Sequence, residues 1–117
     1  MSDAKTSPVI TRPQDPELLA KLERKLVEYQ KRAQEAQGTR HPESAYLTDY
    51  HYRDALFKSA VLREVLTKGE VKTYDLSLEL AKQYEPLDMD RFNNACAVIA
   101  VYCGQLDEGL YGGTGLN

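Results

Sequence analysis

The sequence predicts an all-α protein, with an N-terminal amphipathic helix followed by a compact three-helix body. The first observation is an apolar seam over residues 15–37, whose members are alternately three and four residues apart, as on a helix that buries one face. The second is that three later stretches, 48–68, 74–84 and 88–106, also repeat apolar residues at helical spacing. Gly or Pro separates each of these stretches from the next, as expected for helices joined by short turns.

The first helix has a clear start and a clear end. Asp15 is a favourable N-cap, and Pro16 suits the first helical position because its missing N–H would have no partner there. Glu17 complements the positive end of the helix dipole, and Gly38 favours termination. The seam has the spacing of a heptad repeat and consists of Leu19, Leu22, Leu26, Tyr29, Ala33 and Ala36.

A heptad seam has two interpretations, which the sequence leaves open. Either it packs against the protein's own body, or it joins a second helix in a dimer or in a complex with another protein. The candidate partner-binding residues are Leu19, Leu22, Leu26 and Tyr29. The small side chains of Ala33 and Ala36 bury little area and weaken the coiled-coil interpretation.

The body helices are delimited by Gly69 and Pro86. Between the first two, residues 71–73 either lead into the next helix, with Thr73 as its cap, or form a short strand. The stretch 88–106 is apolar nearly all round, which is typical of a helix in the middle of a bundle or at a subunit interface.

These elements give a domain organisation with one folded body and flexible ends. We expect a disordered tail over 1–14, the heptad helix over 15–37, a linker over 38–47, a helical core domain over 48–108 and a Gly-rich flexible tail over 109–117.

Composition narrows the function classes. A chain of 117 residues with a net charge of −3 has no general attraction for polyphosphate, so nucleic acid is possible as a partner but disfavoured. The longest apolar run, residues 95–103, would span about 13 Å as a helix, whereas a bilayer core is about 30 Å thick. No membrane segment is predicted, and the N-terminus lacks the apolar stretch of a secretory signal.

The two cysteines, Cys96 and Cys103, are predicted to be reduced core thiols. On one helix their Cα atoms would lie about 10.5 Å apart, whereas a disulfide needs less than about 7 Å. Zinc ligands are usually closer in sequence and come in pairs. The cysteines therefore favour a cytoplasmic location and indicate no metal site.

The densest polar cluster surrounds His51 and comprises Tyr46, Asp49, Tyr50, His51, Tyr52 and Asp54. A histidine beside carboxylates is a candidate general base or metal ligand. On a helix, however, Asp49, His51 and Asp54 share no common face. We interpret the cluster as a helix N-terminus, and we predict no catalytic residue, metal ligand or cofactor. A small enzyme or metal protein centred on His51 is a third hypothesis.

The favoured functional prediction is a small, non-enzymatic protein–protein interaction module, such as an accessory subunit, adaptor or regulator. It would act through the first helix and the apolar fourth helix, by binding a partner or by self-association.

The alternative is a winged-helix-like DNA-binding regulator that dimerises through the first helix. The order helix, strand, helix, turn, helix over residues 57–106 is that of such a domain. Its last helix would present Arg91, Asn93 and Asn94 to the bases. Asp88 and Asp90 beside them would repel the phosphates.

Overall fold

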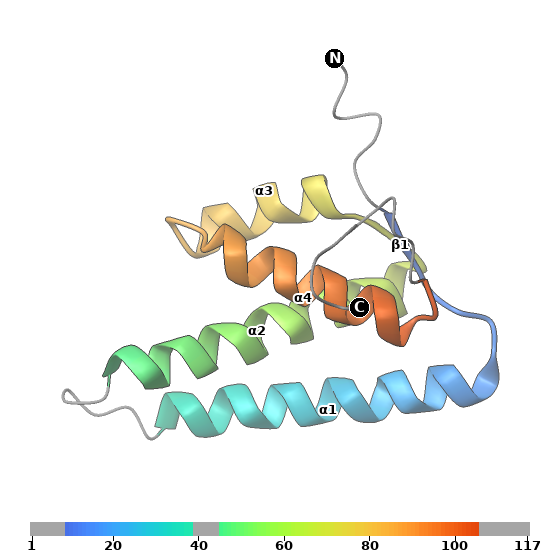
Figure 1. Ribbon diagram of the computed structural model, residues 1–117, viewed down its shortest axis with the longest axis horizontal. Helices are drawn as coiled ribbons and strands as arrows, with labels where there is room; N and C mark the ends of the chain where they lie inside the picture. The colour runs from blue at the N-terminus through green and yellow to red at the C-terminus, as the bar shows by residue number, and fades with distance from the viewer. Residues whose placement is uncertain (1–8, 39–44, 106–117) are drawn as a thin grey trace, which may run out of the picture.

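The computed structural model describes the backbone of residues 9–38 and 45–105, and the side chains of residues 9–36 and 51–105 (Figure 1). The elements in chain order are β1 (Val9–Thr11), α1 (Pro16–Gly38), α2 (Ala45–Lys68), β2 (Glu70–Lys72), α3 (Thr73–Gln83) and α4 (Met89–Tyr102). Helices dominate, so the predicted all-α class is confirmed, with one small sheet added. None of the described helices has both the length and the apolar character needed to cross a bilayer.

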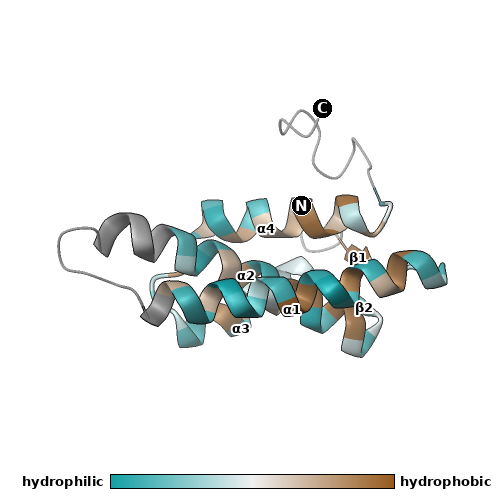
Figure 2. Cartoon of the chain, turned by 90° about the horizontal axis from the view of Figure 1, so that it is seen from below, coloured by the Kyte–Doolittle hydropathy of each residue, from teal (hydrophilic) through white to brown (hydrophobic). Residues whose placement is uncertain are grey.

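The helix α1 begins and ends where the sequence predicted. The Asp15 carboxylate accepts a hydrogen bond from the Glu17 N–H at 3.2 Å, and the Asp15 C=O accepts one from the Leu19 N–H at 3.0 Å. The helix then runs antiparallel to α2 along its length (Figure 1). Hydrophilic and hydrophobic residues alternate along α1 (Figure 2). Its apolar seam faces inward, because the seam residues Leu22, Tyr29 and Ala33 are buried.

The helix α2 is the centre of the fold. Four of its side chains, Phe57, Val61, Leu62 and Val65, have no exposed surface. Adjacent helical residues point about 100° apart, so burial of both Val61 and Leu62 requires cover from more than one side. The helix α1 covers one side, and α4 and β2 pack on others. One core cluster therefore includes side chains of α1 together with those of the predicted body.

The two strands form an antiparallel sheet, with Ile10 opposite Val71. A strand near residues 71–73 was one of the two predictions there, and the structure has it at 70–72. The predicted disordered tail over 1–14 is wrong at residues 9–11, which form β1, and Ile10 is 0% exposed and belongs to the core; residues 1–8 lie outside the described residues. Arg12 ties this segment to α2, since its guanidinium donates to the Leu66 C=O at 2.8 Å.

The helices α3 and α4 complete the core. Lys72, not Thr73, is the N-cap of α3, and its side chain makes no capping bond. Asp88 caps α4 by accepting from the Arg91 N–H at 3.1 Å. The helix α4 ends at Tyr102, earlier than predicted, because the chain turns at Gly104 with φ of 75°. The predicted linker over 38–47 is wrong at residue 38 and at residues 45–47, because α1 includes Gly38 and α2 begins at Ala45. Residues 39–44 and 106–117 lie outside the described residues.

Cys96 in α4 and Cys103, the C-cap residue of that helix, are both free and buried, as predicted for core thiols. Burial raises the pKa of the Cys96 thiol to about 12 and that of Cys103 to about 11. A thiol with such a raised pKa carries almost no thiolate at neutral pH, so neither cysteine is an activated nucleophile.

Candidate functional site

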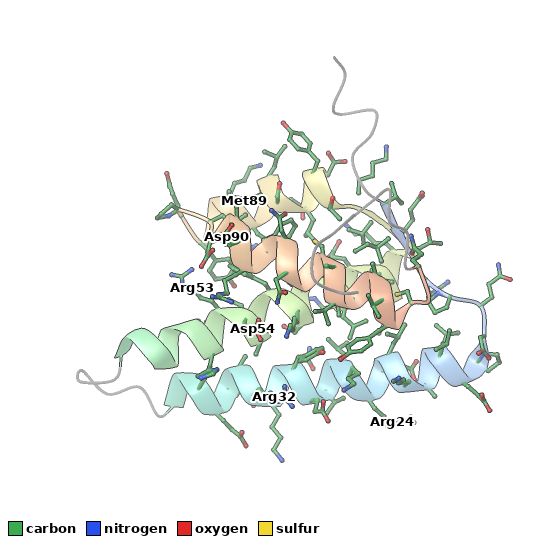
Figure 3. The ribbon with its side chains drawn as sticks, in the orientation of Figure 1. Arg24, Arg32, Arg53, Asp54, Met89 and Asp90 are labelled. Atoms are coloured by element: carbon green, nitrogen blue, oxygen red, sulfur yellow. The ribbon has the colours of Figure 1, made fainter. Side chains whose placement is uncertain are left out.

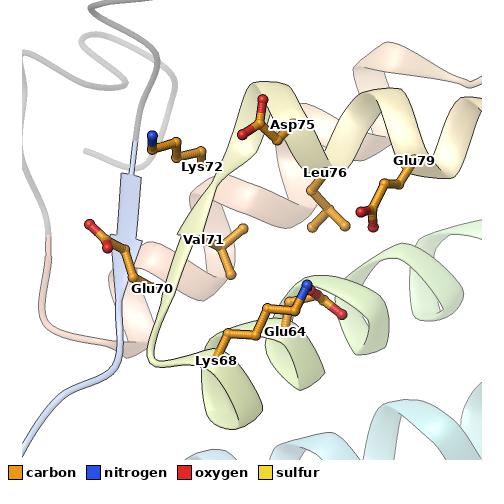
Figure 4. A pocket seen from close by; sticks show the side chains of 8 residues that line it. All are labelled: Glu64, Lys68, Glu70, Val71, Lys72, Asp75, Leu76 and Glu79. Atoms are coloured by element: carbon orange, nitrogen blue, oxygen red, sulfur yellow. The ribbon is translucent and has the colours of Figure 1, made fainter.

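A groove forms where α2 ends and the chain turns back through β2 into α3 (Figure 4). The turn is made by Gly69, whose φ of 81° suits glycine and whose N–H donates to the Val65 C=O at 2.9 Å. The groove encloses about 300 Å³, the lower end of the roughly 300–1,000 Å³ range of ligand pockets. Its lining residues are Glu64, Lys68, Glu70, Val71, Lys72, Asp75, Leu76 and Glu79.

The groove has an apolar floor and a charged rim. Val71 and Leu76 are nearly fully buried and make the floor. The rim carries four carboxylates and two ammonium groups, which leaves it net acidic. Lys68 is already paired, since its Nζ lies 2.8 Å from a Glu64 carboxylate oxygen. The hydrogen bond to Glu64 raises the pKa of Lys68.

One edge of β2 pairs with β1, and the other edge, which no strand within residues 9–38 and 45–105 pairs with, faces this groove. The Arg12 N–H donates to the Gly69 C=O at 2.9 Å, so these two residues form one bonded pair of the ladder. Bonded pairs in antiparallel sheets recur at every second residue, which makes Ile10 and Val71 the next one. The backbone groups of Glu70 consequently point away from β1. Figure 4 shows β1 on one side of β2 and the groove on the other.

The outer edge of β1 is closed by a side chain. The carboxamide of Gln105 donates from Nε2 to the Val9 C=O at 2.8 Å. Its Oε1 accepts a hydrogen bond from the Thr11 N–H. One amide side chain thus satisfies two of the backbone groups that a third strand would otherwise bond, the Val9 C=O and the Thr11 N–H.

A second, smaller hollow of about 160 Å³ continues the groove between α2 and α3. It shares Glu64, Leu76 and Glu79 with the first hollow and reaches Tyr84. The Tyr84 ring is packed edge-on against Phe57, with ring centroids 6.1 Å apart. The junction of α2 and α3 is therefore indented from β2 to the end of α3.

The groove exposes carboxylates, ammonium groups and strand backbone, which are groups that can form hydrogen bonds and ion pairs. Carboxylates accept hydrogen bonds from ammonium and guanidinium groups, and a strand edge pairs with an extended backbone. Ser59 lines the α2–α3 hollow, and its Oγ already donates to the Leu56 C=O at 2.8 Å. Across residues 9–36 and 51–105, no group of three His, Cys, Asp or Glu side chains is placed to hold a metal ion.

The predicted partner-binding residues of α1 line its inner face. Leu22 is 0% and Tyr29 is 3% exposed, and both belong to the core cluster. Leu26 packs against that cluster, and Leu19 is half-buried. In this structure the seam residues pack on the protein's own body, which is the first of the two interpretations of the heptad pattern. Partner binding through them remains a prediction.

Tyr29 also joins α1 to α4. Its side chain forms a hydrogen bond with that of Tyr102. The pKa of Tyr29 is raised mainly by burial and, to a smaller extent, by this hydrogen bond. Lys25 Nζ lies 5.2 Å from the centroid of the Tyr102 ring, and Lys58 Nζ lies 5.7 Å from that of Tyr29. Such cation–π contacts hold the two rings between α1 and the body.

The residues predicted to read DNA lie at the start of α4. Asn93 and Asn94 are exposed, and Arg91 is half-buried with its Nε 3.9 Å from Asp88. Figure 3 places Met89 and Asp90 at the same end of the helix, and both are exposed. The carboxylates predicted to repel phosphate are therefore next to the candidate base-reading amides.

His51 is exposed on α2 and lines a hollow of about 510 Å³ between α1 and α2. Arg32 of α1 and Asp54 of α2 line it too, and both are labelled in Figure 3. Tyr52 is half-buried, whereas the side chains of Tyr46 and Tyr50 lie outside the described residues.

Tyr74 and Leu78 on α3, which are 54% and 49% exposed, were not among the predicted contact residues. The signal was present, because residues 74, 76, 78 and 80 are all apolar. A helix cannot bury an alternating set on one face, and Leu76 and Leu80 are the members that pack in the core.

Comparison of the chain with family models, with curated proteins and with solved structures finds no match.

Proposed function

We propose that the protein is a small, non-enzymatic protein–protein interaction module, an accessory subunit, adaptor or regulator, that binds its partner through α3. The observation that supports this is the exposed pair Tyr74 and Leu78, one helical turn apart on the same face. Tyrosine is enriched among the residues that dominate binding energy at interfaces. The acidic pair Asp75 and Glu79 lies next to them around the helix and lines the groove.

This proposal moves the contact surface away from α1. Leu22 and Tyr29 are used by the protein's own core, so a partner would reach them only if α1 left the body. Tyr74 and Leu78 need no such opening.

Affinity capture from host lysate, with nuclease treatment, tests the proposal. The wild type is compared with a Tyr74→Ser/Leu78→Ser variant and with a control, Val27→Ser, which removes another exposed apolar side chain (64% exposed) from α1. A near-stoichiometric, nuclease-resistant protein partner is expected with the wild type and the control. The α3 variant should lose it at least tenfold, since it removes an interface anchor. Equal capture by all three proteins would contradict the proposal.

A second candidate is the DNA-binding regulator, which the order α2, β2, α3, α4 and the exposure of Asn93 and Asn94 favour. A fluorescence anisotropy titration of labelled duplex DNA at about 50 and 200 mM salt tests it. This candidate requires binding that weakens as salt rises, because phosphate contacts release counterions. It also requires loss of sequence preference in Asn93→Ala/Asn94→Ala. Absence of binding at about 50 mM salt removes it.

A further inference from the structure

We propose that the groove between α2, β2 and α3 binds an extended, lysine- or arginine-bearing segment of a partner protein, which adds to the free edge of β2 as a third strand. This inference rests on the proposed function and specifies the chemistry of the partner. Its basis is the juxtaposition of a strand edge that no other described strand pairs with, an apolar floor and an acidic rim in one hollow.

The edge supplies three backbone groups. The N–H and C=O of Glu70 point away from β1, and no hydrogen bond joins either one to another described residue. The Lys72 N–H points the same way, whereas the Lys72 C=O begins the hydrogen-bond series of α3. One residue of an incoming segment can therefore exchange two bonds with Glu70, as in an antiparallel bonded pair, and the residue two positions before it can accept a third from the Lys72 N–H.

The strand geometry also fixes where side chains of the added segment point. Val71 is buried, while Glu70 and Lys72 are exposed on the opposite face of β2. The incoming residue opposite Glu70 shares that outward face, and its two neighbours point into the groove. There they meet Leu76 at the floor and Glu79 on the wall.

These surroundings select the partner's charge. A lysine or arginine can lay its aliphatic stem over Leu76 and bring its cationic head to Glu64 or Glu79. On the outward face, a cation opposite Glu70 makes a favourable cross-strand pair. An acidic segment would meet like charges at these positions. The other edge of the sheet is not available in the same way, because Gln105 occupies it.

Amide hydrogen exchange of the free protein is the first test. The Val71 N–H bonds within the ladder and should be protected, whereas the Glu70 and Lys72 N–H groups should exchange at least tenfold faster. Strong protection of Glu70 would show that another part of the chain already covers the edge, and would overturn the proposal.

The second test is an NMR titration with an acetylated, amidated hexapeptide of alternating lysine and threonine. Shifts should centre on residues 70–79, with a Kd of about 1 mM or tighter, the weak end of specific binding. The same peptide with alternate N-methylated amides should bind at least tenfold more weakly, since it cannot complete the edge bonds. A glutamate–threonine peptide should also bind at least tenfold more weakly. Shifts spread over the whole surface, or equal binding of the three peptides, would overturn the proposal.

Variants of the protein distinguish the contribution of backbone hydrogen bonds to peptide binding from that of the charged side chains. Glu70→Pro removes an N–H that no described residue uses and should abolish binding of the lysine peptide. Glu79→Lys should weaken it at least fivefold, while Glu23→Lys, the same charge change on the exposed face of α1, should leave it unchanged. If Glu70→Pro does not fold, the N-methylated peptide and Glu79→Lys still decide the question.

The two proposals fail differently. A lysate partner that requires Tyr74 and Leu78 but binds equally to Glu70→Pro would overturn the groove proposal and leave the module. Binding of the lysine peptide at β2, without any captured partner, would overturn the module and leave the groove.

Discussion

The two outer edges of the small sheet are treated in opposite ways. At the β1 edge, Gln105 supplies a donor and an acceptor to Val9 and Thr11, and so takes the place of a third strand. At the β2 edge, the backbone of Glu70 faces a hollow with an apolar floor. An uncovered strand edge is a template for pairing with another chain, and proteins usually blunt it. One edge of this sheet is blunted from within, and the other is short and flanked by charge.

The difference also separates structural from binding roles. The β1 edge lies beside Ile10, a core residue, and is joined to the end of α4 through Gln105. The β2 edge borders Asp75 and Glu79, exposed residues that the core does not use. Changes on the β1 side should therefore lower stability, and changes on the β2 side should alter binding.

Ile10→Ala should have the largest effect on stability. The side chain is fully buried, so its truncation should lower the free energy of unfolding by about 2–5 kcal/mol. Urea denaturation followed by far-UV circular dichroism measures this value. Val27→Ala, at an exposed position on α1, is the control and should stay within about 0.5 kcal/mol. Equal small effects would show that β1 is not part of the cooperative core.

Gln105→Ala should cost less than Ile10→Ala. It removes two hydrogen bonds, each worth about 0.5–1.5 kcal/mol net, so the expected loss is about 1–3 kcal/mol. Gln83→Ala, at an exposed site at the end of α3, is the matched control. An unchanged urea midpoint for Gln105→Ala would mean that water replaces the carboxamide without cost.

Proline at two facing positions compares the edges directly, because Thr11 and Glu70 are opposite each other in the register. Thr11→Pro removes the N–H that donates to Gln105 and should cost about 0.5–1.5 kcal/mol. Glu70→Pro removes an N–H that bonds to no described residue and should therefore cost less stability than Thr11→Pro. In a Gln105→Ala background the cost of Thr11→Pro should shrink, since the two changes remove one shared bond. Equal costs for the two prolines would contradict the asymmetry of the edges.

The helices could be predicted because their signals are local. Asp15, Pro16 and Gly38 act within one or two turns of the helix that they delimit, and the structure places α1 at 16–38. The strand at residues 70–72 was foreseen as one of two possibilities, since Gly69 marked the turn before it.

The N-terminal strand could not be predicted in the same way. It contains three residues, and its partner is about sixty residues away, so no periodicity identifies it. The β-branched sequence of Val9, Ile10 and Thr11 favours a strand, but the flanking prolines and polar residues suggested a tail.

The candidate site depends on this non-local pairing. Only when β1 covers one edge of β2 does the other edge become the open one. The heptad seam of α1 likewise shows that an amphipathic pattern predicts a buried face without saying what buries it. Here Leu22 and Tyr29 pack in the protein's own core.

Lys68→Ala should have the smallest effect of these changes. It tests how the charge of the groove rim influences peptide binding at the β2 edge. Lys68 pairs with Glu64 on the groove rim, and the exposed ammonium group neutralises a carboxylate that a partner's cation would use. Exposed ion pairs are weak, so removal of Lys68 should tighten binding of the lysine–threonine peptide by only about 1.5- to 5-fold. Lys31→Ala on the exposed face of α1 makes the same charge change at a distance and should leave the Kd unchanged. The gain should also fade at high salt, because the attraction between exposed charges is screened. Weaker binding by Lys68→Ala would mean that the groove prefers an anionic segment, and the assigned charge of the partner would then be wrong.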